Sequence, residues 1–243
     1  MQQFRAWVTR VCLALVLGMG GAVQAASLQL SPTSLSLPAG QRAGALVLRN
    51  TGRAPVTAQI RAFSWQQDAQ GKDVLTPTAA LIVSPPMVRL DAGAEQQFRV
   101  IRAQTAGGGG EQAYRLWIDE LPPPGAAPGK GIQFLLRHSV PVFLNSEENP
   151  DARLRWRVMA SGKGGAELEV RNEGPVHAQL SIMRVQPRAG GRDIPISNGL
   201  FAYVLPGHVI RRPLPVSLQA LRQGQFIAVV NAHETRPPLE FVP

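Results

Sequence analysis

The stretch that decides the fold is Val47-Leu48-Arg49-Asn50-Thr51-Gly52, followed closely by Pro55-Val56-Thr57-Ala58-Gln59-Ile60. Apolar and polar side chains alternate on each side of the Asn-x-Gly turn, which is typical of two half-buried strands. The pattern returns as Glu169-Val170-Arg171-Asn172-Glu173-Gly174 and Pro175-Val176-His177-Ala178-Gln179-Leu180. Chance is one interpretation, because Asn-x-Gly turns are common between strands. We favour the other, which is two related sandwich modules.

Composition favours an all-β protein. The 243 residues include 24 Gly and 21 Pro, which break helix interiors. Only 17% of the residues are charged and 44% are hydrophobic, which argues against disorder. The sequence therefore predicts a first sandwich over residues 27–145 and a second over 150–243. The polar stretch Asn145–Pro150 suits the linker between them.

Residues 1–26 have the pattern of a secretory signal peptide. Arg5 and Arg10 precede the apolar run Val11–Gly18, and the small residues Ala25 and Ala26 suit cleavage. Cys12 is the one cysteine of the chain and lies inside this leader, so we expect no disulfide and no thiol chemistry. The expected location is the periplasm, and the sequence predicts no membrane insertion.

Enzymatic, metal-binding and nucleic-acid-binding functions are disfavoured. The four histidines are not at metal-ligand spacings, and no nucleophile elbow or phosphate-binding loop occurs. The net charge of +9 does not select a partner by itself, and its arginines are scattered along the chain. We therefore expect no enzyme, no cofactor, no metal and no nucleic acid.

The segment 131–144 is unusual for a strand. It is long and strongly apolar. Pro141 has no backbone N–H to donate to a neighbouring strand, which suits an edge or a bulge. An apolar edge strand is prone to aggregation unless a partner chain pairs with it. The alternative is a central strand that is buried on both faces. A free edge of this kind also allows the chain to cap itself as a dimer.

The sequence resembles the periplasmic chaperones of the chaperone–usher pilus pathway, in a divergent, archaic-like branch. The resemblance covers nearly the whole chain after the leader. It is carried by the order and spacing of Pro85–Gly93, Tyr114–Pro122 and Val140–Phe143. The resemblance implies two immunoglobulin-like β-sandwich domains in an L-shaped arrangement.

The resemblance also implies an ATP-independent function called donor-strand complementation. In this mechanism the chaperone lends a strand to a pilus or surface-coat subunit that lacks its own last strand, and then delivers the subunit to an outer-membrane usher. By position, the subunit-binding side chains would be Ile132, Phe134, Leu136, His138 and Val140. The alternative function is a two-module secreted structural or adhesive protein that keeps this strand for itself.

Two further sites follow from the resemblance. Well-studied members hold the subunit's C-terminal carboxylate with two cations, but the matching positions here are Ser34 and Pro141. We therefore expect Arg89 and Arg137 to act as the anchor instead, since a guanidinium suits a carboxylate. The expected usher-contacting residues are Pro55, Thr57, Gln59 and Pro86.

Overall fold

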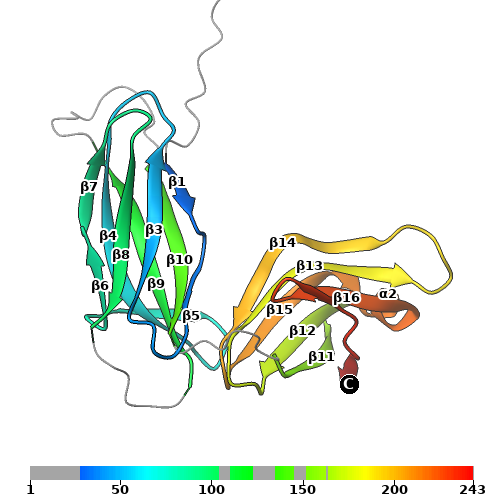
Figure 1. Cartoon of the computed structure of the whole chain (residues 1–243). Coiled ribbons are helices and arrows are strands. Elements are labelled where there is room, and N and C mark those ends of the chain that lie inside the picture. Colours follow the sequence, from blue (N-terminus) through cyan, green and yellow to red (C-terminus); the bar gives the residue numbers. More distant parts are fainter. Residues whose placement is uncertain (1–27, 104–109, 123–134, 145–151, 163, 243) are drawn as a thin grey trace, which may run out of the picture.

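The computed structural model describes residues 28–103, 110–122, 135–144, 152–162 and 164–242. These residues form two β-sandwiches whose long axes meet at a steep angle, so that the molecule is L-shaped (Figure 1). The expected leader, the expected linker, Ile132 and Phe134 lie outside the described residues. Within the described ranges, no helix is long and apolar enough to cross a membrane.

The first sandwich consists of a four-stranded and a six-stranded sheet. In the four-stranded sheet the order is β1 (Leu28–Ser31), β3 (Ala43–Asn50), β8 (Glu95–Arg102) and β6 (Leu81–Ser84). In the six-stranded sheet the order is β2 (Leu35–Leu37), β10 (Arg137–Leu144), β9 (Gln112–Leu121), β4 (Val56–Gln67) and β5 (Asp73–Pro77), and β7 (Met87–Leu90) also pairs with β4.

The second sandwich consists of two four-stranded sheets. One has the order β15 (Val209–Ser217), β12 (Gly165–Asn172), β11 (Leu154–Ser161) and β18 (Glu240–Val242). The other has the order β14 (Ile194–Val204), β13 (Ala178–Pro187), β16 (Gly224–Val230) and β17 (His233–Thr235). The short helix α2 (Leu218–Gln223) connects β15 to β16, and the Ser217 hydroxyl accepts a hydrogen bond from the Ala220 N–H at its start.

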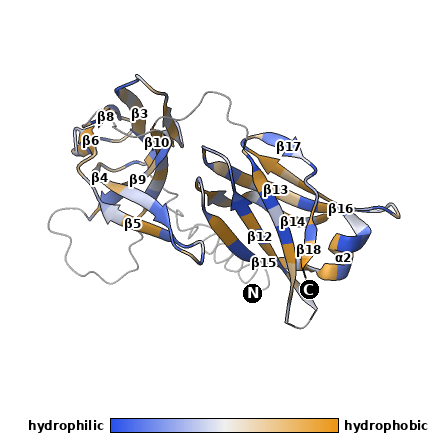
Figure 2. Ribbon diagram, turned by 90° about the horizontal axis from the view of Figure 1, so that it is seen from below, coloured by the Kyte–Doolittle hydropathy of each residue, from blue (hydrophilic) through white to orange (hydrophobic). Residues whose placement is uncertain are grey.

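Each sandwich has its own apolar core, which the alternating sequence pattern builds. Hydrophobic and hydrophilic residues alternate along strands such as β13 (Figure 2), so one face of each strand points between the sheets. The fully buried side chains of the first core include Leu46, Phe98 and Leu116, and those of the second include Leu168 and Leu180. The two cores are separate clusters, as two domains require.

The repeated Asn-x-Gly motif has the same structural role in both sandwiches. The Asn50 amide donates to the carbonyls of Ala54, Leu90 and Asp91, and its oxygen accepts from the Gly52 N–H. The Asn172 amide likewise donates to two carbonyls, and its oxygen accepts from the Gly174 N–H. Both side chains are fully buried, so each one satisfies backbone groups at a turn that would otherwise lack partners.

We predict that Asn172→Ala destabilises the second sandwich by on the order of 3 kcal/mol. The substitution leaves the carbonyls of Val176 and Val204 and the N–H of Gly174 without their partner, and unsatisfied buried groups are costly. Urea unfolding measures the loss. Asn198→Ala, at an exposed position of β14, is the matched control, and an equal loss in both variants would contradict the prediction.

Candidate functional site: the free edge of β10 and the interdomain contact

Strand β10 is central along one half and free along the other. It pairs with β9 over its whole length, from Arg137 opposite Asp119 to Leu144 opposite Gln112. On its other side it pairs with β2, but only over Val142–Leu144. Among the described residues, no strand pairs with this side over residues 137–141. The edge-strand interpretation therefore holds for residues 137–141, and the central-strand interpretation holds for Val142–Leu144.

The free part of β10 borders a hollow between the two sheets of the first sandwich. The opposite wall belongs to β1 and the turn after it. The lining residues are Leu28, Gln29, Leu30, Thr33, His138, Ser139 and Val140. Such an edge offers unpaired main-chain groups beside a wall of mixed apolar and polar side chains, which is an arrangement that an additional strand can use.

Three of the predicted subunit-binding residues are described, and they share one face of the segment by alternation. Val140 is buried, His138 is half-buried, and Leu136 is half-buried just before the strand begins. The Nε2 atom of His138 is buried and has no hydrogen-bond partner in the described part of the chain. The neighbouring Leu135 is 46% exposed. The face shared by Leu136, His138 and Val140 is therefore apolar along the free edge, except for the His138 imidazole.

Arg137, one of the two expected anchor residues, is already paired. Its Nε donates to the Asp119 carboxylate, and its guanidinium lies 4.1 Å from the ring centroid of Trp117. Arg61 donates to the same carboxylate at 2.7 Å. Burial acts to raise the pKa of Asp119, but the hydrogen bonds and charges of Arg137 and Arg61 outweigh it and lower this pKa. Arg137 thus has a counter-ion within its own sheet.

Arg89, the other expected anchor residue, lies at the far side of the same sheet. It is exposed on β7, opposite Thr57 of β4. Strands β4 and β9 separate it from β10, which places the two arginines roughly 14 Å apart across the strands. Arg89 and Arg137 are therefore not neighbours, and one carboxylate does not reach both.

The four predicted usher-contacting residues lie on one surface. Thr57 and Gln59 are half-buried on the same face of β4, and Gln59 is opposite Met87, which is 50% exposed. Pro55 is exposed just before β4. Pro86 is exposed, and its carbonyl accepts from the Ile60 N–H at 2.8 Å. The fold thus gathers these residues where β4 and β7 pair.

A cation that sequence reasoning did not single out lies where the two sandwiches meet. Arg115 of β9 is opposite Pro141, and its guanidinium lies 3.7 Å from the Trp65 ring centroid and 5.1 Å from that of Tyr203. Its side chain is only 12% exposed, and Asp73 is 3.7 Å away. Burial lowers the pKa of Arg115, and the charge of Asp73 partly offsets this. The sequence signal was limited to strand alternation, which places Arg115 on the face of β9 opposite to the buried Tyr114 and Leu116.

The interdomain contact is mostly apolar. Trp65 and Phe143 of the first sandwich pack with Tyr203 and Leu205 of the second in one buried cluster. The Nε1–H of Trp65 is buried there and has no partner within the described ranges. Gln67 adds two directional contacts, because its amide donates to the Tyr203 carbonyl and accepts from the Leu205 N–H. These hydrogen bonds fix the end of β4 against the second sandwich.

The hairpin between β4 and β5 completes the contact. Its residue Gly71 has a φ of +74°, and an added Cβ would lie 2.6 Å from the Val209 carbonyl oxygen and 2.7 Å from the Ile210 Cα. Arg212 of β15 donates to the Gly71 carbonyl at 3.2 Å. Only glycine allows the hairpin to approach the second sandwich this closely.

We predict that Gly71→Ala loosens the two sandwiches relative to each other without unfolding either, because the new methyl group displaces the hairpin from β15. Small-angle X-ray scattering should show a larger radius of gyration. Gly40→Ala is the matched control, because Gly40 also has a positive φ, of +92°, but has no atom within contact distance of an added Cβ. If both variants behave alike, backbone strain rather than the close approach is responsible.

The fold and the free edge define a two-domain, immunoglobulin-like sandwich protein in which one edge of β10 is unpaired over residues 137–141 in the described part of the chain. The chain belongs to the family of pili and flagellar-assembly chaperones, since the sequence model of that family's PapD N-terminal domain matches residues 27–148. This is a chaperone family rather than a family of enzymes. In the described part of the chain, no three His, Cys, Asp or Glu side chains are grouped so that they could hold a metal ion.

Comparison with individual proteins agrees with this assignment. An uncharacterized fimbrial chaperone of Escherichia coli K12, YhcA, is 26% identical over 92 residues, which are 38% of this chain and 41% of that relative. A chain of the CsuC–CsuE chaperone–tip adhesion subunit complex, from the archaic chaperone-usher Csu pili of Acinetobacter baumannii, is 25% identical with a TM-score of 0.65 over 90% of this chain and 100% of its own. The E. coli chaperone DraB, 17% identical, shares the fold with a TM-score of 0.60 over 88% of this chain and 97% of its own.

Proposed function

We propose that this protein is an ATP-independent periplasmic chaperone that stabilises a pilus or surface-coat subunit by donor-strand complementation and delivers it to an outer-membrane usher. The observation that carries the proposal is the free edge of β10 over residues 137–141, with Val140 buried beside it. Membership of the chaperone family supports it, as does the likeness to a complex of an archaic chaperone with a tip subunit. Periplasmic residence and the cleaved signal peptide are part of the same proposal.

The lent surface would use alternate side chains of the segment before and along β10. Ile132 and Phe134 stay predictions from the sequence, and Leu136, His138 and Val140 continue their register. Each large apolar side chain that enters a subunit's groove contributes roughly 1.5–3 kcal/mol of burial energy. Main-chain hydrogen bonds to the free edge would fix the alignment of the two strands, because in strand addition every second residue pairs with the partner.

We predict that Leu136→Asp abolishes capture of the subunit, because a carboxylate does not tolerate transfer into an apolar groove. The measurement is a pull-down from periplasm of the native organism, with bound proteins identified by mass spectrometry. Leu135→Asp is the matched control, because the adjacent side chain is on the opposite face and 46% exposed.

Retention of the same subunit by the Leu136→Asp variant would contradict donor-strand complementation. Failure of the unmodified protein to capture any subunit that lacks a strand would favour the two-module structural or adhesive alternative. Both variants should first give the β-sheet circular dichroism of the unmodified protein.

The carboxylate anchor has three candidate cations, of which we favour Arg115. Arg137 is paired with Asp119, whose carboxylate it shares with Arg61, and Arg89 is distant from β10. Arg115 is beside Pro141, one of the positions where other family members carry a cation, and its nearest counter-ion is 3.7 Å away. A buried guanidinium whose counter-ion is not in direct contact gains stability when a carboxylate binds to it, so Arg115 suits the carboxylate of a subunit.

We predict that Arg115→Met weakens subunit binding by about tenfold or more, because one charge-assisted hydrogen bond contributes on the order of 1.5–3 kcal/mol. Binding of the purified subunit by biolayer interferometry measures the change. Arg137→Met and Arg89→Met test the two residues expected from the sequence, and a larger loss in either would reassign the anchor.

The usher-contacting surface and self-pairing complete the predicted interactions. Pro55, Thr57, Gln59 and Pro86 lie on the β4–β7 surface, across the sheet from the free edge, so usher binding and subunit binding can occur together. A second copy of the chain could pair with the free edge when no subunit is bound.

A further inference from the structure

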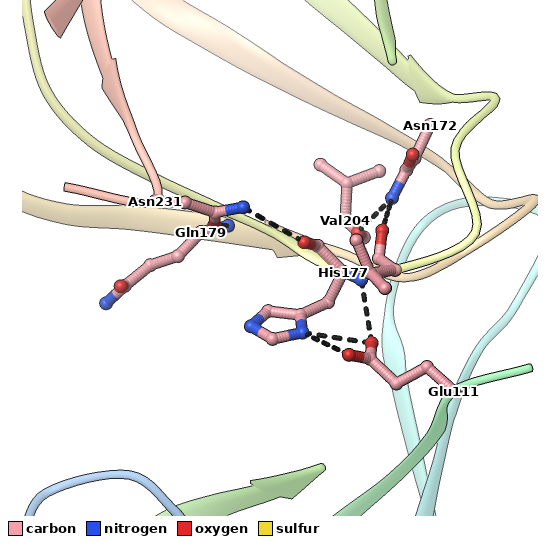
Figure 3. Close-up of polar contacts among 7 residues, drawn as sticks. Glu111, Asn172, His177, Gln179, Val204 and Asn231 are labelled. Carbon is pink, nitrogen blue, oxygen red and sulfur yellow. Dashed lines mark hydrogen bonds and ion pairs between the residues drawn. The ribbon is translucent and has the colours of Figure 1, made fainter. Parts of the chain in front are cut away.

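A second polar contact joins the sandwiches, away from the β4–β5 hairpin. His177 precedes β13 in the second sandwich, and Glu111 precedes β9 in the first. Figure 3 shows the Glu111 carboxylate facing both the ring and the backbone of His177. Its Oε1 accepts from the His177 backbone N–H at 2.7 Å, and both carboxylate oxygens lie 2.9 Å from the Nδ1 atom of the ring.

The imidazole also contacts the strand that we propose is lent. Its ring stacks face to face on Phe143 of β10, with centroids 3.4 Å apart and planes 3° from parallel. Asn231 fixes this segment from behind, because its side chain donates to the His177 carbonyl and accepts from the Gln179 N–H (Figure 3). His177 therefore touches a carboxylate of the first sandwich and the buried end of β10 at the same time.

The charge balance at this contact depends on one proton. The Glu111 side chain is 0% exposed and that of His177 is 13% exposed. No arginine or lysine of the described residues forms an ion pair with Glu111, so His177 is its one basic side-chain partner there. Tyr203 lies 6.1 Å from the His177 ring, and beyond it Arg115 is paired with Asp73. Burial raises the pKa of Tyr203, partly offset by the charge of Arg115, so its phenol stays neutral.

We propose that His177 and Glu111 form a proton-operated latch that holds the second sandwich against Phe143 at the base of β10. Protonated His177 gives the buried carboxylate an opposite charge, which tightens the contact. Deprotonation at higher pH removes that charge, leaves a buried carboxylate with a neutral partner, and loosens the contact. Histidine is the side chain whose ordinary titration falls between about pH 5 and 8, and this is the range in which the latch is tested.

The latch adds regulation to the proposed function and rests on it in one respect, namely that β10 is the lent strand. When the latch is closed, Phe143 is held between the sandwiches and the free edge has a fixed direction relative to the second sandwich. When it is open, the base of β10 loses one of its contacts, and the apolar cluster, the Gln67 hydrogen bonds and the β4–β5 hairpin hold the second sandwich with greater freedom of movement.

Double electron–electron resonance on the free protein tests the latch. Spin labels at Gln97→Cys on β8 and Asn198→Cys on β14, both exposed, report the distance between the sandwiches in a full-length Cys12→Ser background. The closed latch gives a narrow distance distribution and the open latch a broad one. We expect the ratio of the narrow to the broad population to fall roughly fivefold between about pH 5.5 and about pH 8, because a charge-assisted hydrogen bond becomes a neutral one.

Two variants and one control make the outcome specific. His177→Gln keeps a donor but cannot titrate, and Glu111→Gln keeps an acceptor without the charge, so the ratio should be independent of pH in both. His233→Gln changes an exposed histidine of the same sandwich and should behave as the unmodified protein. If His177→Gln does not fold, Glu111→Gln alone decides.

A pH-independent ratio in the unmodified protein, or an unchanged titration in either latch variant, would overturn the proposal. So would loss of the titration in His233→Gln. No subunit takes part in this measurement, so the failure of donor-strand complementation and the failure of the latch are observed separately.

Discussion

Burial of the last residues of β10 is the constraint on which the rest of the structure depends. Val142 and Leu144 point into the core of the first sandwich, while Phe143 points into the cluster between the sandwiches. Strand β2 covers the edge of these three residues and ends there. The same strand is therefore fixed at one end and free at the other, and the fixed end holds the free end in a defined register against β9.

The orientation of the two sandwiches follows from contacts at this fixed end. Apolar packing of Trp65, Phe143, Tyr203 and Leu205 brings the domains together but is not directional. Direction comes from Gln67, which bonds to the backbone on both sides of Val204, and from the close approach of Gly71 to β15. Small polar and glycine contacts thus decide the angle that the apolar cluster stabilises.

Part of the candidate site could be predicted from the sequence because strand alternation is a local property of the chain. The length and apolar character of the segment, together with Pro141, suit an edge strand, but the pattern alone left a central strand buried on both faces as an equal alternative. The cation for the proposed carboxylate anchor was less predictable. Arg137 shares a strand face with Pro141, but its nearest charge is Asp119 on the neighbouring strand, and strand pairing is not visible in a single strand's pattern.

The sequence by itself determined the all-β class, the two modules and the Asn-x-Gly turns, because period-two alternation and turn chemistry are local properties of the chain. Asn50 and Asn172 have the same bonding role because the same short motif builds the same turn. Tertiary structure alone decided that Arg115 enters an aromatic contact and that His177 meets Glu111 and Phe143. These residues come from different strands and different domains, and their proximity depends on strand order and domain angle, which non-local packing sets.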